Sequence, residues 1–196
     1  YIRRDRELGG RLHEHLRLRC HKLRKRHRGP ERRGRLPDKR SIEDRPEEAN
    51  DRSEIGHWEI DTVMGKGSKD CLLIVVERKT RFALVGKLEN RTQKEVNSRL
   101  LKLIGPYRNY FKTITSGNGT EFHGYKSVEK KTGVKFYFAH PYHSWERGTN
   151  ENTNGLIRQY WRKGTCLREV NQWKCRKIVD KLNRRPRKVL GGRSPI

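Results

Sequence analysis

The sequence lacks long apolar runs and is poor in acidic residues. No stretch approaches the roughly 18 to 20 consecutive apolar residues that cross a bilayer, and the amino terminus has no signal-like apolar region. Asp and Glu number 23 against 48 Lys and Arg, which gives 196 residues a formal net charge of +25. These absences argue against a membrane protein, and the excess positive charge favours a polyanionic partner, nucleic acid first.

The sequence also lacks paired cysteines. Cys20, Cys71, Cys166 and Cys175 form no C-x-x-C pair, so their spacing predicts neither a zinc knuckle nor a disulfide framework. We therefore expect reduced thiols in a cytoplasmic protein. The chain starts at Tyr1 and stops just after a turn-like "GGRSPI". We expect it to be a fragment of a longer protein.

Composition divides the chain into three predicted parts. Residues 1–40 hold 16 Lys or Arg against five acidic residues, with too few large apolar side chains to fold alone. They are predicted to form a basic arm that lies along phosphates, the alternative being a solubilising tail. Residues 41–55 are predicted to form an extended acidic connector. Residues 56–196 are predicted to form the folded core.

Seven cations in the densest part of the arm are the strongest candidates for DNA backbone contacts. Gly29, Pro30 and Gly34 break any helix begun before them, which favours an extended segment. Each phosphate contact on duplex DNA contributes about −0.9 to the log–log slope of affinity against salt. Such charges supply affinity rather than sequence preference. The seven are Arg24, Lys25, Arg26, Arg28, Arg32, Arg33 and Arg35.

Short β-branched and aromatic segments in the core predict a sheet. Strands are expected at 57–64, 71–78, 81–88, 112–116 and 135–140, the first three joined by short antiparallel connections. Helices are expected at 92–105 with Thr92 as N-cap, near 121–132, from 145 or 149 to 161, and at 168–183. Hairpin strands followed by strands that alternate with helices predict an α/β fold: a mixed five-stranded sheet flanked by helices, in a ribonuclease-H-like order.

Two acidic residues of the core stand out as candidates for chemistry. Asp61 lies midway along a predicted strand, where a buried unpaired carboxylate is costly. Glu151 opens a predicted helix. Phosphodiester chemistry uses two divalent cations about 3.5–4 Å apart, held by carboxylates that converge from different elements. The alternative is that Asp61 ends a strand on an exposed edge and Glu151 only favours a helix N-terminus.

Residues 56–195 resemble the catalytic domain of bacterial insertion-sequence transposases of the IS-thirty family. These are DDE transposases related to retroviral integrases. The segments that carry the resemblance are "GHWEIDTVMG", "TSGNGTEF", "PYHSWERGTNENTNGLIRQYWRKGT" and "LNRRPRKVLGGRSP", in the family's order and spacing, and the upstream "RRGRLPDKRSIEDRP" also resembles the family.

The resemblance implies metal-dependent cleavage at transposon ends and strand transfer into target DNA. It implies two Mg²⁺ ions, with Mn²⁺ as a substitute, and a homodimer or larger homo-oligomer on double-stranded DNA near the bacterial nucleoid. By position, Asp61 is the first triad member and Glu151 the third. Gly117 occupies the second place, where the family has aspartate. We expect one cation or none to be held and activity to be lost or severely impaired, because Glu59 and Glu121 have places of their own.

Further residues around Glu151 are weaker candidates for DNA contacts. Polar and cationic groups here can touch phosphates and bases beside the reacting bond. His140 and His143 have the H-x-x-H spacing of a metal site, but they precede a Trp, so we favour a supporting or DNA-contacting role over zinc. The candidates are His143, Trp145, Arg147, Asn150, Asn154, Arg158 and Lys163.

Two other readings stay open at this point. One is a non-enzymatic DNA-binding protein derived from a transposase, such as a repressor of transposition, which Gly117 favours. The other is an RNA-cleaving ribonuclease H. It is disfavoured because it needs the same absent carboxylate and does not explain the basic arm or the "GTNENTNGLIRQ" helix.

Overall fold

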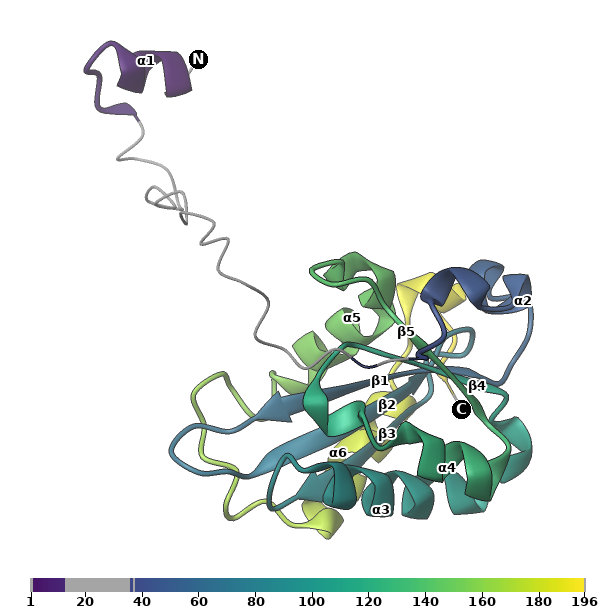
Figure 1. The fold of residues 1–196 in the computed structure, drawn as a ribbon. Coiled ribbons are helices and arrows are strands. Elements are labelled where there is room, and N and C mark those ends of the chain that lie inside the picture. Colours follow the sequence, from purple (N-terminus) through teal and green to yellow (C-terminus); the bar gives the residue numbers. More distant parts are fainter. Residues whose placement is uncertain (1, 13–35, 37, 196) are drawn as a thin grey trace. The chain divides into compact units, whose positions relative to one another are not determined.

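The computed structural model describes residues 2–12, 36 and 38–195 (Figure 1). The chain divides into two compact units, 1–32 and 33–196. In the first unit, α1 (Ile2–Glu7) is a short helix, so the predicted arm includes one helical segment. The seven arm cations predicted to contact phosphates, at positions 24–35, lie outside the described residues. None of the helices in the described part of the chain is long and apolar enough to cross a membrane.

A five-stranded mixed sheet forms the centre of the second unit (Figure 1). Its spatial order is β3-β2-β1-β4-β5, with β2 antiparallel to both β1 and β3, and β4 parallel to both β1 and β5. The prediction of a mixed five-stranded sheet is confirmed. The strands are β1 (His57–Met64), β2 (Cys71–Glu77), β3 (Ala83–Leu88), β4 (Thr113–Ser116) and β5 (Lys135–Phe138).

Helices cover both faces of this sheet and bury two apolar layers. The side chains of β2 alternate: Leu73 and Val75 join the layer under α3 and α4, whereas Leu72 and Ile74 join the layer under α5 and α6. β2 is buried along its whole length because both faces are covered. The helices are α3 (Gln93–Ile104), α4 (Tyr125–Thr132), α5 (Gly148–Ile157) and α6 (Gln172–Asn183).

Helix α6 also closes the free edge of the sheet. The side-chain amide of Asn183 accepts from the backbone N–H of Ala83 and donates to its carbonyl, both at 2.9 Å. The side-chain amide of Gln172 also forms two hydrogen bonds with the backbone of β3. It accepts from the N–H of Lys87 and donates to the carbonyl of Val85, both at 2.9 Å. Edge strands expose unpaired backbone groups that favour aggregation. Two amides of one helix satisfy them here.

Local capping explains where the predicted boundaries were wrong. The connector expected to be extended holds a 3₁₀ turn (Ile42–Asp44), which a capping box of Ser41 and Asp44 stabilises, and a short helix α2 (Glu47–Asp51). Helix α6 begins four residues later than predicted, since the Asn171 side chain caps it by accepting from the N–H of Lys174 at 2.9 Å. The predicted N-cap Thr92 is confirmed.

Cysteine placement agrees with reduced thiols. Cys71, Cys166 and Cys175 are all free, and Cys20 lies outside the described residues. Burial raises the pKa of the Cys71 and Cys175 thiols to about 11, so both stay protonated and unreactive at neutral pH. These two side chains pack in the hydrophobic core and have no role as reactive thiols.

Candidate active site

Asp61 lies on the central strand β1 and is bound by two side chains of the α5 segment. Its Oδ2 accepts a hydrogen bond from the Asn154 side-chain amide at 3.0 Å. Its Oδ1 lies 3.3 Å from Nη1 of Arg147, which also donates to the Ile60 carbonyl at 3.2 Å. The Asp61 side chain remains 27% exposed. This carboxylate is therefore compensated by a cation and an amide and still reaches solvent.

Glu151 lies on the same stripe of α5 as those two partners. Arg147 is the N-cap residue, and Glu151 and Asn154 follow it by four and seven residues, a spacing that puts all three on one helical face. Because Arg147 and Asn154 both contact Asp61, the stripe between them faces the same part of β1. Glu151 is exposed in the first turn of α5, where the helix dipole favours a carboxylate.

Gly117 directly follows β4, the strand paired in parallel with β1. The register sets Glu59 opposite Thr115, so the same register carried two residues further brings Gly117 beside Asp61. The φ of Gly117 is outside the left-handed region, so its backbone conformation does not require glycine. A Cβ at this position would lie 3.0 Å from Nη2 of Arg147.

The guanidinium of Arg147 therefore lies next to the place of the absent side chain. Its Nε would be 3.6 Å from a Cβ at position 117. This Nε is a buried donor with no hydrogen-bond partner among the described residues. Buried donors are nearly always paired, and each exception needs an explanation. A carboxylate at position 117 would extend toward this guanidinium and supply the acceptor that it lacks.

Two other carboxylates near Asp61 are engaged elsewhere. Glu59 is fully buried, forms an ion pair with Arg78 and accepts from the backbone N–H of Asn150 at 2.9 Å. Burial lowers the pKa of the Arg78 guanidinium and Glu59 opposes that effect. Glu121 is buried and accepts from the Thr62 hydroxyl at 2.8 Å. Both carboxylates thus contact the fold around them, and that neither replaces the carboxylate absent at Gly117 stays a prediction.

The sequence of this chain is similar to an integrase core domain and to several insertion-sequence transposases. The integrase core domain matches residues 51–144. The chain is 40% identical over 195 residues to the transposase for insertion sequence element IS4351 of Bacteroides fragilis, covering 100% of this chain and 60% of that protein. It is 42% identical over 175 residues to the transposase for IS1086 of Cupriavidus metallidurans, covering 87% and 51%. It is 37% identical over 155 residues to the InsI transposase for IS30A of Escherichia coli, covering 79% and 40%.

These matches support an IS30-type DDE transposase. Its five-stranded sheet with helices on both faces is the ribonuclease-H-like fold of the integrase core. The transposase chain spans about half the length of the curated relatives it matches.

The donor set of this transposase chain does not fit a pair of divalent cations. Integrase-core enzymes of the DDE type use divalent metal ions, and two such ions need carboxylates from three elements. Position 117 supplies no side-chain oxygen, and the guanidinium of Arg147 lies beside the space that a Cβ there would occupy. A fixed positive charge next to Asp61 further disfavours a second cation.

The structure distributes the predicted DNA-contact residues unevenly. Trp145 is 67% exposed, and Lys163 is also at the surface. Arg158 is half-buried and donates to the carbonyl of Met64 at 3.2 Å. Asn150 differs from the prediction of a DNA contact, because its side chain is fully buried; its backbone N–H donates to Glu59.

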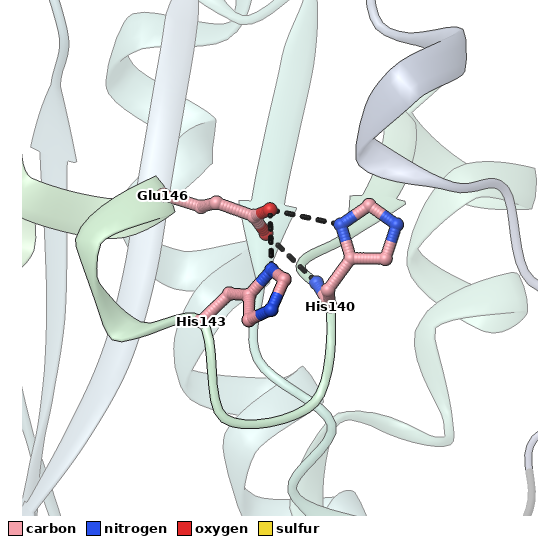
Figure 2. A group of neighbouring side chains, drawn as sticks. All are labelled: His140, His143 and Glu146. Atoms are coloured by element: carbon pink, nitrogen blue, oxygen red, sulfur yellow. Dashed lines mark hydrogen bonds and ion pairs between the residues drawn. The ribbon is translucent and has the colours of Figure 1, made fainter.

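A cluster that sequence reasoning identified only in part lies just before α5. Figure 2 shows His140 and His143 pointing at the carboxylate of Glu146. Burial alone raises the pKa of Glu146, but hydrogen bonds from His140 and His143 outweigh it and hold that pKa below its ordinary value. The sequence prediction included both histidines but missed Glu146. The spacing H-x-x-H-x-x-E was the signal that could have found it.

Proposed function

We propose that this chain is the catalytic core of an insertion-sequence transposase that binds transposon-end DNA but performs little or no strand cleavage or transfer. Asp61 and Glu151 are the first and third members of its triad, and Gly117 stands at the second. The observation that supports this proposal is the register of β4 on β1, which, extended two residues past the pair Glu59–Thr115, aligns Gly117 with Asp61 beside an unpaired N–H of Arg147.

The chemistry explains why one missing carboxylate matters so much. In each transfer step an attacking oxygen loses a proton and bonds to phosphorus, while the bond to the leaving oxygen breaks and that oxygen takes up charge. An intact triad collects two Mg²⁺ ions, or Mn²⁺ in their place, to stabilise both oxygens. In this chain Asp61 is partnered by Arg147 and Asn154, and position 117 supplies no carboxylate.

Binding is proposed to survive the loss, because it depends on charge rather than on the triad. With a net charge of +25, the chain is expected to bind double-stranded DNA in the cytoplasm, as a homodimer or larger homo-oligomer that holds two element ends. The arm cations at positions 24–35 and the exposed Trp145 and Lys163 are the proposed contacts.

A strand-transfer assay tests the proposal. The chain, Gly117→Asp and Gly117→Ala are incubated with Mg²⁺ or Mn²⁺ and a duplex carrying the terminal sequence of the element that encodes the chain. We expect Gly117→Asp to exceed the other two by at least about 100-fold, since metal stabilisation of the transition state is worth several kcal/mol. Gly117→Ala controls for the added Cβ alone.

Two outcomes would contradict this proposal in different ways. Robust transfer by the unaltered chain would show that Gly117 does not limit the reaction. DNA binding without any transfer by Gly117→Asp would instead favour a second candidate, a DNA-binding protein such as a repressor of transposition. The pairing of Asp61 with Arg147 is the observation that favours that candidate, because it compensates the carboxylate without a metal ion.

A further inference from the structure

Two histidines and a glutamate outside the triad gather on the segment between β5 and α5 (Figure 2). Nδ1 of His140 lies 2.8 Å, and Nδ1 of His143 lies 3.2 Å, from the same oxygen, Oε1 of Glu146. One donor atom from each residue lies within 4.8 Å of the others. Two imidazole nitrogens and one carboxylate oxygen around a common point are the ligand set of three-ligand zinc sites and of related transition-metal sites.

Each imidazole is oriented by a partner that leaves its Nδ1 directed at Glu146. Nε2 of His140 lies 3.5 Å from Oε1 of Glu43, on the 3₁₀ turn Ile42–Asp44. The ring of His143 stacks on Trp145, with centroids 4.4 Å apart and planes at 26°. A metal-binding histidine commonly donates its other ring N–H to a carboxylate, which fixes the tautomer and the ring orientation. Glu43 stands in that position relative to His140.

The backbone between the ligands is folded to bring them together. Successive turns join the N–H of His143 to the carbonyl of His140 and the N–H of Glu146 to the carbonyl of His143, both at 3.2 Å. Tyr142, between the two histidines, has a φ of 66°, in the left-handed region that non-glycine residues seldom adopt. Such a conformation costs about 1 kcal/mol or more and is concentrated at ligand-binding sites. The backbone strain is located in the turn that brings His143 back toward His140.

We propose that His140, His143 and Glu146 bind one divalent transition-metal ion of the Zn²⁺ class, with a further coordination position open to water. Binding replaces the two Nδ1–H···O hydrogen bonds with metal–nitrogen bonds. In each neutral imidazole the proton moves from Nδ1 to Nε2; the Nε2–H of His140 then donates a hydrogen bond to Glu43, and that of His143 donates to water. The mixed nitrogen and oxygen set favours Zn²⁺ over Mg²⁺, which prefers oxygen ligands alone. This site is chemically distinct from the carboxylate triad and does not depend on the proposed function.

The bound ion would tie the end of β5 to the start of α5. His140 follows β5 by two residues, and Glu146 immediately precedes Arg147, the N-cap residue that contacts Asp61. An ion held here would therefore fix the first turn of α5, the turn that bears Glu151. The expected consequence is structural: protection of residues 139–150 from hydrogen exchange should increase at least about tenfold when Zn²⁺ is added.

Calorimetric titration of the whole chain with Zn²⁺ tests the site. Other histidines and cysteines can also bind Zn²⁺, so the readout is the difference between variants. We expect His143→Gln and Glu146→Gln to lose one bound ion per chain, and Glu43→Gln to bind that ion about tenfold more weakly. His123→Gln, a change to a half-buried histidine elsewhere in the chain, is the matched control and should titrate as the unaltered chain does. Mg²⁺ should not compete.

Co²⁺ absorption gives a second readout, because a site of nitrogen and oxygen ligands shows no thiolate-to-metal charge-transfer band. The proposal is overturned if His143→Gln and His123→Gln bind equal numbers of Zn²⁺ ions with equal affinity, or if the ion that is lost carries the thiolate band. Circular dichroism checks that each variant is folded. In the Gly117→Asp background, His143→Gln should still remove one bound Zn²⁺ ion per chain, so failure here is distinguishable from failure of the transposase proposal.

Discussion

Arg147 bridges from the N-cap of α5 to Asp61 on the central strand, with Nη1 3.3 Å from Oδ1. The same guanidinium lies 3.0 Å from the position that a Cβ at residue 117 would take. One cation thus lies between the residues proposed as the first and second members of the triad. The partner left to the Asp61 carboxylate is therefore an arginine, where an intact triad would hold a metal ion.

Removing this cation should destabilise the chain modestly. Arg147→Met deprives half-buried Asp61 of one of its two partners, so we expect the free energy of unfolding to fall by about 1–2 kcal/mol. Arg162→Met removes an exposed arginine close by and should stay within about 0.5 kcal/mol. Urea denaturation measures both changes.

The same substitution made in the Gly117→Asp background tests the contact at position 117. If the introduced carboxylate meets Arg147, the cost of Arg147→Met should grow by about 0.5–3 kcal/mol, the range seen for interacting neighbours. Additive costs in this double-mutant cycle would show that the two side chains do not meet. The register of β4 on β1 would then be a poor guide to the site.

The ion pair between Glu59 and Arg78 should be costly to break from one side. Both side chains are buried, and Arg78 also donates to the Ala49 carbonyl at 2.7 Å. We expect Arg78→Met to lower the free energy of unfolding by about 3–5 kcal/mol, because it leaves a buried charge uncompensated. Glu59→Leu combined with Arg78→Met should recover a large part of that loss. A double variant as unstable as the single one would contradict this account.

Stability should fall below neutral pH partly because of His57. Burial lowers the pKa of this imidazole from its ordinary value of 6.5, and its Nδ1 lies 2.8 Å from the Thr113 hydroxyl. The unfolded chain therefore binds a proton at a higher pH than the folded chain does. The contribution of His57 to the free energy of unfolding is fully present above about pH 7. It is lost as the pH falls through about 6.5 toward the folded-state pKa.

His57→Gln provides the comparison for this pH dependence. The loss of unfolding free energy between about pH 7.5 and pH 5 should be smaller in the variant than in the unaltered chain, because all other titrating groups are shared. Denaturant titrations at a series of pH values measure it. Parallel curves for the two proteins would mean that burial does not perturb this histidine.

Much of the fold could be predicted from local sequence, whereas the contacts of the site could not. The β-branched segment 57–64 coincides with β1, and Thr92 caps α3, because both signals act over a few residues. The predicted start of α6 was wrong, because the side-chain cap of Asn171 sets the first residue of this helix. The prediction that the acidic connector is extended was wrong, because it rested on overall composition and did not consider the local capping box at Ser41.

The roles of Arg147 and Asn154 depend on how a helix packs on a strand far away in the sequence. Each was predicted to touch DNA, yet the structure turns both toward Asp61. No local pattern encodes that contact, because it arises from the parallel pairing of β4 with β1 and the packing of α5 on the sheet. The resemblance supplied triad positions, but not the guanidinium that lies beside the vacant one.

The central claim is that the carboxylates of Asp61 and Glu151 flank the vacancy at Gly117. Anomalous scattering from Mn²⁺ in crystals of the Gly117→Asp chain bound to an element end tests it most directly. We predict an ion at about 2.1 Å from oxygens of Asp61 and of the introduced aspartate, with a second ion shared by Asp61 and Glu151, and fewer ions in the unaltered chain. Mn²⁺ bound away from these residues, or Glu151 directed away from Asp61, would contradict the account.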